Sequence, residues 1–249
     1  MRKPMIAGNW KMYKTIQESV ATVTDLKAKV SGISDREIII CPVFTCLKSA
    51  CDAAKGSNIK VGGQDLFWEE KGAFTGEISA GQIKDTGCTH VIIGHSERRQ
   101  YFHETNETVG KKIQAALKTG LTPIVCVGET LAERESGKTF AVNEKHVREG
   151  MGSLSKEQAA RIVIAYEPVW AIGTGKVATP AQAEEVHIYI RKTIASMFGQ
   201  DVAEGLRILY GGSVKPENIS ELMAQGNIDG ALVGGASLEA DSFTKIIKY

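Results

Sequence analysis

The chain has 249 residues, of which 43% are hydrophobic and 24% are charged, an ordinary composition for a globular protein. Its 30 lysines and arginines are balanced by 29 aspartates and glutamates, so the formal net charge is +1. This balance excludes a bulk basic field that would recruit nucleic acid or an anionic membrane, so any attraction for an acidic ligand has to be local.

Eight short apolar runs, each followed by a helical or loop-and-helix stretch, are predicted to be strands. Their apolar character is continuous rather than alternating, which indicates strands that are covered on both faces and therefore parallel. Amphipathic segments with an apolar stripe near the helical period, such as residues 109–117 and 183–197, lie between them. In chain order the predicted strands are Met5–Trp10, Ile38–Cys41, Ile59–Gly63, His90–Ile93, Thr122–Val127, Ile162–Tyr166, Arg207–Tyr210 and Ala231–Val233.

Strands that alternate with helices over about 250 residues favour a (β/α)8 barrel over an open doubly wound sheet. No proline- or serine-rich linker, low-complexity tract or charge block divides the sequence, so we expect one domain over residues 1–249. Polar residues follow the predicted strands at their carboxyl ends: Asn9 and Lys11 after the first, His95 after the fourth and Glu167 after the sixth. In a barrel these ends meet at one mouth, where barrel enzymes carry their active sites.

Glu167 ends a buried strand that Pro168 prevents from continuing. A carboxylate in this position, among apolar neighbours, is a candidate general base with a raised pKa. About twelve residues separate it from a helix that begins near Thr179, where roughly six would connect a strand to a helix. The bulky Trp170 and Ile172 lie in this connection, which therefore favours a lid over an ordinary loop.

His95 lies where a buried strand turns into a helix. A helix N-terminus lowers the pKa of a histidine and favours a neutral imidazole that donates one hydrogen bond, although a structural histidine is the alternative. Lys11 is expected to hold a phosphate and to stabilise negative charge that develops beside it, unless it is a solvated surface lysine. Glu97, on the first helical turn, is either the partner of Lys11 or a simple helix-start carboxylate.

Two Gly-Gly pairs follow the last two predicted strands. Residues 211–212 with Ser213, and Gly234 with Gly235, let backbone N–H groups approach and cradle an anion. A short helix at residues 236–238 would add its positive end. One such pair signals only a turn, but two after consecutive terminal strands match the phosphate site common in barrels. A base, a neutral electrophile, a lysine, a phosphate cradle and a lid suit proton abstraction beside a carbonyl in a small phosphorylated substrate.

The cysteines and the start of the chain bear on the compartment. The first residues lack the apolar core of a signal peptide, and no apolar run approaches the roughly 18 residues that a membrane helix needs. There is no C-x-x-C pair among the five cysteines, and Cys41, Cys46 and Cys51 match neither zinc nor iron–sulfur spacing. We expect reduced thiols in a cytoplasmic protein that binds no metal, membrane or nucleic acid.

Seven motifs occur in order along the whole chain: GNWKM at 8–12, GAFTGE at 72–77, GHSERR at 94–99, CVGETL at 126–131, AYEPVWAIGTG at 165–175, YGGSV at 210–214 and VGGASL at 233–238. Together they resemble the motifs of the triosephosphate isomerase family. The resemblance implies a TIM barrel that interconverts dihydroxyacetone phosphate and D-glyceraldehyde 3-phosphate through an enediolate, without a cofactor. It also implies a place in glycolysis, gluconeogenesis and the pentose shunt.

The resemblance also implies roles for individual residues. Glu167 would move the proton between the two carbons, and a neutral His95 would polarise the carbonyl. Lys11 would bind the phosphate and a substrate oxygen, Asn9 would hydrogen-bond the reacting oxygens, and Glu97 would be a further catalytic residue. The remaining expected contacts to the substrate are Ile172, Gly173, Ser213, Gly234 and Gly235, of which Gly173 would donate its N–H only with the lid shut; Cys126 and Glu129 look like supporting residues.

The family's usual assembly is a homodimer, in which the loop around Thr75 of one subunit would enter a pocket of the other. Residues 64–68 run towards Phe74 and are apolar for a solvent loop, which agrees with this expectation. Many relatives carry Asn where this chain has Asp65, a difference that is expected to affect the interface rather than the chemistry.

Two alternatives to an isomerase remain. Another phosphosugar enzyme would need either a Schiff-base lysine inside a strand, as in an aldolase, or metal ligands, as in many epimerases; we expect neither in the eight runs. A non-catalytic phosphate-binding protein on the same fold is the second alternative. It would have no use for Asn9, Lys11, His95 and Glu167 together.

Overall fold

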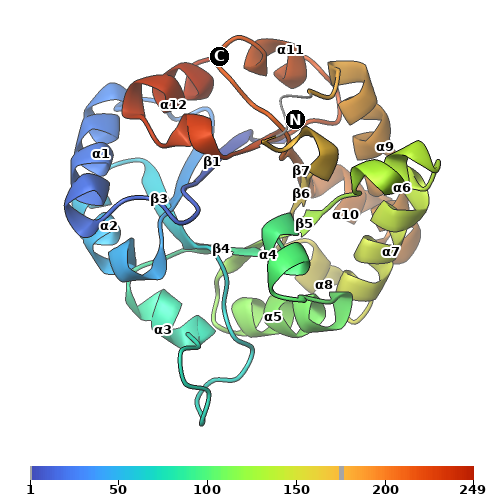
Figure 1. Cartoon of the computed structure of the whole chain (residues 1–249), viewed down its shortest axis with the longest axis horizontal. Helices are drawn as coiled ribbons and strands as arrows, with labels where there is room; N and C mark the ends of the chain where they lie inside the picture. The colour runs from blue at the N-terminus through green and yellow to red at the C-terminus, as the bar shows by residue number, and fades with distance from the viewer. Residues whose placement is uncertain (1, 174–176) are drawn as a thin grey trace.

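The structure, a computed structural model, describes residues 2–173 and 177–249. Its centre is a closed barrel in which β1 to β8 follow one another in sequence order and every pair of neighbours is parallel (Figure 1). The predicted barrel is therefore confirmed, with strand ends that differ from the expected ones by at most one residue. The strands are β1 Met5–Asn9, β2 Glu37–Cys41, β3 Ile59–Gly63, β4 His90–Ile93, β5 Thr122–Val127, β6 Val163–Tyr166, β7 Arg207–Tyr210 and β8 Gly230–Val233.

The strands are covered on both faces, which explains their continuous apolar character. Side chains such as Met5, Ile39 and Leu209 fill the interior of the barrel, whereas alternate residues such as Ile6 and Ile38 pack against the surrounding helices. The period of two along each strand thus divides one apolar run between two cores.

The helices form a ring around the barrel (Figure 1). Several begin with a capping box, in which a Ser or Thr side chain and the residue three positions later bond each other's backbone N–H groups. One such box, formed by Thr179 and Gln182, starts α9, and Pro180 between them occupies the first turn of the helix. The helices are α1 Ile16–Lys29, α2 Leu47–Ala54, α3 Ala80–Asp85, α4 Ser96–Tyr101, α5 Asn106–Lys118, α6 Leu131–Glu135, α7 Thr139–Met151, α8 Lys156–Ala159, α9 Pro180–Phe198, α10 Gln200–Gly205, α11 Ile219–Met223 and α12 Ala240–Ile247.

The short helix expected at residues 236–238 is a 3₁₀ turn, Gly235–Ser237, which begins one residue earlier. The expectation of no lysine within the strands is wrong, because Lys60 lies on β3. Its side chain is exposed and pairs with Glu37 on β2 instead of entering the barrel. Lys60 therefore offers no support for a Schiff-base aldolase.

The segment between β3 and α3, residues 64–79, extends away from the body of the molecule (Figure 1). Its base is fixed by a buried group of charges. Asp65 is paired with Lys112 of α5 at 2.7 Å and with Arg98 of α4 at 2.8 Å, and Lys112 also contacts Glu104. Asp65 is only 5% exposed, so its carboxylate serves contacts within the chain.

The barrel closes where β8 pairs with β1, and Gly230 lies at this seam. Its φ of +148° is open to glycine, and a Cβ built there would lie 1.8 Å from the Met5 carbonyl oxygen. No other residue fits this approach of the two strands.

Among the described residues, no helix is long and apolar enough to cross a membrane.

Candidate active site

Two predicted residues meet at the carboxyl ends of β4 and β6. Glu167 directly follows β6 and is 2% exposed, and its Oε1 lies 2.8 Å from Nε2 of His95, the residue that caps α4. The other carboxylate oxygen, Oε2, accepts a hydrogen bond of 2.9 Å from the Ser96 backbone N–H. Both oxygens of the carboxylate are therefore engaged by groups at the start of α4.

The hydrogen bonds around His95 assign its tautomer. The Glu97 backbone N–H donates to Nδ1 at 3.2 Å, which requires that nitrogen to be unprotonated. The ring proton therefore lies on Nε2, where it is donated to Glu167. The first turn of α4 thus holds an imidazole that presents one N–H to the mouth of the barrel.

The expected pKa shifts of this pair are wrong in direction. Burial opposes ionisation of Glu167, but His95 and the Ser96 N–H outweigh it and hold the pKa of the carboxyl below its usual value. Burial also disfavours a charged His95, but the adjoining Glu167 carboxylate outweighs burial and raises the pKa of the imidazole. The direct contact between the two groups favours the ionised form of the carboxyl and outweighs the effect of burial, and no pattern in the sequence shows that contact.

Lys11 and Asn9 lie at the end of β1. The Asn9 side-chain oxygen accepts the Lys11 backbone N–H at 3.0 Å, which stabilises a left-handed backbone with φ of +50° at Lys11. This conformation turns the lysine side chain towards α4, where Nζ lies 2.6 Å from Oε1 of Glu97. Of the two alternatives that the sequence left open for Glu97, the structure shows the pairing with Lys11.

These groups surround one cavity of about 280 Å³. All the predicted site residues except Glu97 line it, namely Asn9, Lys11, His95, Glu167, Ile172, Gly173, Ser213, Gly234 and Gly235. The glycines of its wall follow β7 and β8, and a Cβ built on Gly234 would lie 3.5 Å from Cε of Lys11. A loop rich in backbone N–H groups thus adjoins an ammonium group, an arrangement that suits a phosphate.

Two glycines support Glu167 in ways that the sequence did not reveal. A Cβ built on Gly128 would lie 1.7 Å from the Glu167 carbonyl oxygen, and one on Gly211 would lie 2.9 Å from the Glu167 Cγ. Both sites therefore need glycine because the Glu167 backbone and side chain pass so close. Both glycines belong to motifs noted in the sequence, but only the packing shows that the residue they make room for is Glu167.

The connection after Glu167 is anchored by the buried Glu129. Its Oε1 accepts hydrogen bonds from Tyr166 Oη at 3.0 Å and from Trp170 Nε1 at 2.9 Å, and its Oε2 accepts one from Asn143 Nδ2 at 3.1 Å. The expected lid also includes residues 174–176, which lie outside the described residues. Cys126 is buried inside the barrel, where burial and the Glu167 carboxylate raise the pKa of its thiol.

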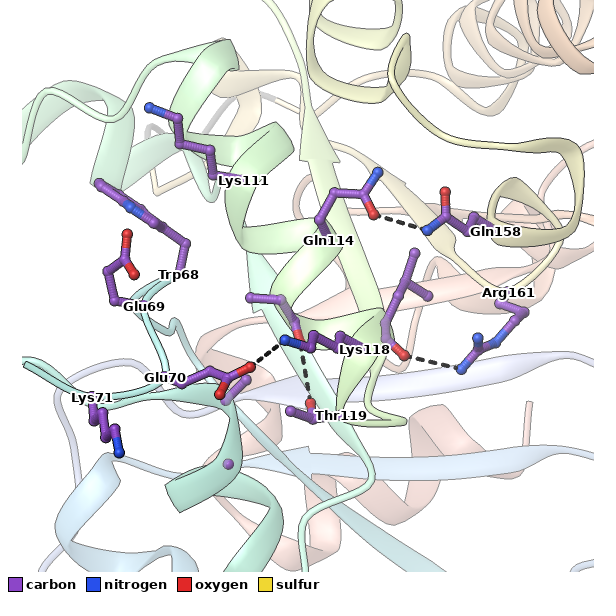
Figure 2. Close-up of a pocket in the computed structure, with 14 residues that line it drawn as sticks. Trp68, Glu69, Glu70, Lys71, Lys111, Gln114, Lys118, Thr119, Gln158 and Arg161 are labelled. Carbon is purple, nitrogen blue, oxygen red and sulfur yellow. Dashed lines mark hydrogen bonds and ion pairs between the residues drawn. The ribbon is translucent and has the colours of Figure 1, made fainter.

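A larger cavity, of about 880 Å³, lies between the base of segment 64–79 and α5 (Figure 2). Two of its charged groups have partners within the lining: Lys118 pairs with Glu70, and Arg161 donates to the Leu117 carbonyl oxygen at 3.4 Å. Gln114 and Gln158 also bond each other at 2.8 Å. This cavity holds none of the predicted site residues, so the smaller one is the candidate active site. Across residues 2–173 and 177–249, no group of three or more histidine, cysteine or acidic side chains is placed to hold a metal.

Comparisons with known proteins agree with this geometry. A sequence model described as triosephosphate isomerase matches residues 4–249. The triosephosphate isomerases of Endomicrobium trichonymphae and Moorella thermoacetica are 62% and 60% identical over 249 residues, covering 100% of this chain and 99% of each relative. The crystal structure of triosephosphate isomerase from Bartonella henselae superposes with a TM-score of 0.90 at 42% identity, covering 99% of this chain and 98% of that one.

Proposed function

The chain belongs to the triosephosphate isomerase family, and from that premise we propose that the cavity between Lys11 and Glu167 is where its reaction takes place. The enzyme interconverts dihydroxyacetone phosphate and D-glyceraldehyde 3-phosphate. The two compounds differ in the carbon that carries the carbonyl. One proton therefore has to move between adjacent carbons, and the hydroxyl proton has to change oxygens.

Glu167 acts as the base in this proposal. The carboxylate removes the proton beside the carbonyl and returns it to the neighbouring carbon, which leaves an enediolate in between. Its present bonds to His95 and Ser96 lower its basicity. When a substrate displaces them, burial remains as the main influence, and burial raises the pKa of a carboxyl group. Binding thus turns a weak base into a stronger one.

His95 acts as the electrophile. Its Nε2–H is donated to Glu167 at the wall of the cavity and is released when a substrate displaces that contact, and the Glu97 N–H on Nδ1 opposes protonation of that nitrogen. A neutral imidazole can donate this hydrogen bond to a substrate oxygen as negative charge develops there, and it can pass protons between the two oxygens. Triosephosphate isomerases are the standard example of this division of roles between a carboxylate base and a neutral imidazole. In this chain both groups accept a hydrogen bond from a backbone N–H at the start of α4.

Lys11 and the glycine loops bind the phosphate. Lys11, Ser213, Gly234 and Gly235 line the same cavity, which supports this assignment. Asn9 lies beside the reacting carbons, and Glu97 holds Lys11 in place. Ile172 and Gly173 close over the substrate as the first part of a lid. Excluding water protects an enediolate, because its β-phosphate is readily eliminated.

A homodimer in the cytoplasm completes the proposal, with residues 1–249 as one catalytic domain. Large apolar side chains remain exposed after β1, β3 and β4, at the carboxyl end of the barrel; examples are Met12, Phe74 and Tyr101. Such exposure is unusual for a monomer and suits an interface that includes the loop around Thr75. Light scattering on the purified protein should give twice the mass of 26.9 kDa.

The observation that carries the active-site proposal is the buried Glu167–His95 contact beside a phosphate cradle. We expect Glu167→Gln to lower kcat by at least about 10²-fold, because the amide cannot act as a base. Turnover of D-glyceraldehyde 3-phosphate is measured in metal-free buffer with a coupling reductase that is specific for dihydroxyacetone phosphate. A folded Glu167→Gln dimer with nearly the original kcat would remove Glu167 from the mechanism.

A further inference from the structure

Two cysteines outside the active site lie side by side. Cys51 is on α2, Cys88 is in the turn that precedes β4, and their Sγ atoms are 3.9 Å apart. The two backbones are close as well, since a Cβ built on Gly87 would lie 3.4 Å from the Cys51 Cβ. A disulfide needs its Sγ atoms at about 2.05 Å, and side-chain rotations can supply most of this approach where the backbones already pack together.

The surroundings of the two thiols differ. Cys88 is 1% exposed, and the Thr86 hydroxyl donates to its Sγ at 3.2 Å. Cys51 is the one cysteine of the five that is not buried, and every cysteine lies in the described part of the chain. A hydrogen bond from the Cys88 thiol lowers the pKa of Cys51, whereas that bond, together with burial, raises the pKa of Cys88. A half-buried thiol in contact with a fully buried one is the arrangement of a redox-sensitive pair.

We propose that Cys51 and Cys88 are a modification site at which a hydroperoxide forms a reversible disulfide. The Cys51 thiolate attacks one peroxide oxygen and releases hydroxide, which takes up a proton to give water, and leaves a sulfenic acid. The Cys88 sulfur then attacks the Cys51 sulfur, loses its proton and expels the sulfenic oxygen as water. Two thiols and one hydrogen peroxide thus give one disulfide and two waters.

The position of the pair determines the consequence of oxidation. The new bond would close a ring from residue 51 to residue 88, which contains β3, segment 64–79 and α3. Cys88 precedes the amino end of β4, whereas the substrate cavity lies at the carboxyl ends of the strands. Oxidation should therefore stabilise the fold by restricting the unfolded chain while leaving turnover nearly unchanged.

The other three cysteines are buried, so the expected oxidation is selective for the Cys51–Cys88 pair. Cys41 is fully buried, and burial raises the pKa of its thiol to about 12. Cys46 and Cys126 are also buried. Cys46 provides a matched control, since the Sγ contacts the Thr45 hydroxyl and the Lys14 carbonyl oxygen, which a serine hydroxyl could also contact. Cys46→Ser removes one thiol and keeps the pair.

The test treats the full-length protein with hydrogen peroxide and counts free thiols under denaturing conditions. The wild type should fall from five thiols to three, with a Cys51–Cys88 linked peptide in non-reducing mass spectrometry and full reversal by dithiothreitol. Its Tm should rise by about 5–10 °C, with turnover within about twofold of the reduced enzyme. Cys46→Ser should form the same linked peptide.

The single variants test the order of the steps. Cys88→Ser should stop at the sulfenic acid, which dimedone traps at Cys51, whereas Cys51→Ser should show no adduct at Cys88. Retention of five thiols in the peroxide-treated wild type would overturn the proposal. So would linkage of Cys51 to any residue other than Cys88, or first oxidation at Cys126.

Discussion

Lys11 has a strained backbone conformation that hydrogen bonds with neighbouring side chains stabilise. Its φ of +50° is uncommon for a residue with a side chain and costs of the order of 1 kcal/mol or more. Two side chains hold it: Asn9 accepts its N–H at 3.0 Å, and Gln64 donates to its carbonyl oxygen at 2.8 Å. The strain has a function in the proposed site, because this conformation turns the lysine side chain along the cavity wall towards Glu97.

We expect Lys11→Met to lower kcat/KM by about 10- to 150-fold, the value of one hydrogen bond to a charged group. The methionine is unbranched and only one atom shorter than the lysine, but it removes the positive charge that would face the phosphate. Steady-state kinetics with D-glyceraldehyde 3-phosphate measures the effect. The same change at the exposed Lys248 is the control and should leave kcat/KM unaltered. Equal kinetics for both variants would contradict a phosphate contact at Lys11.

At the scale of the element, the connection between β6 and α9 depends on one buried carboxylate. Glu129 lies after β5, yet it accepts hydrogen bonds from Tyr166, the last residue of β6, and from Trp170 in the following turn. Its backbone oxygen also accepts the Val169 N–H at 3.0 Å. The residues on both sides of Glu167 are therefore positioned by an acceptor from the neighbouring strand connection.

Replacing this acceptor tests the role of the connection. Glu129→Gln removes the negative charge, so the ion pair with Arg134 at 3.4 Å is lost and the hydrogen bonds from Tyr166 and Trp170 are no longer charge-assisted. We expect a fall in Tm of about 3–8 °C and a kcat lower by about tenfold, since hydrogen bonds to a buried charged group are weakened and Glu167 loses support from the residues on either side of it. Glu135→Gln, an exposed substitution on α6, should change neither value. An unchanged kcat in a destabilised Glu129→Gln protein would limit Glu129 to the fold.

For the whole molecule, three buried or half-buried histidines predict a loss of stability in acid. Burial lowers the pKa of His90 and of His187 to about 4, and burial with the nearby Arg99 lowers that of His146 to about 3. These values lie below about 6.5, the value in an unfolded chain. The unfolded state therefore binds protons first as the pH falls. The stabilisation is complete above about pH 6.5 and is lost as the pH approaches about 4.

We expect the Tm to fall by about 10 °C or more between about pH 7 and pH 4.5, where each of these histidines contributes about 1–3 kcal/mol. At lower pH the loss should continue. Burial opposes ionisation of Glu37, but Lys60 and Arg207 outweigh it and hold the pKa of this carboxyl at about 2. Thermal unfolding followed by circular dichroism measures the dependence. His187→Gln should flatten it, and the exposed His103→Asn should not. A Tm independent of pH over this range would refute the argument.

The sequence predicts the barrel well because the pattern that indicates a buried strand occurs eight times along the chain. Eight continuous apolar runs each indicate a covered strand, and an error of one residue at an end, as at Ile162, leaves the topology unchanged. The positions of the site residues follow from the fold, because parallel strands present their carboxyl ends at one mouth. Their protonation does not follow, because the His95–Glu167 contact depends on side-chain geometry. Lys60 shows a second limit: the exposure of a strand residue is decided by its register in the barrel.

The closing pair of strands also has a consequence for the synthesis of the protein. One edge of β1 pairs with β2, but the other edge remains unpaired until β8 has been synthesised, more than 220 residues later. Until the last strand leaves the ribosome, the nascent chain carries two open sheet edges, on β1 and on β7, and such edges can pair with other chains. A ribosome that stalls or terminates before Gly230 would therefore release a product prone to aggregation.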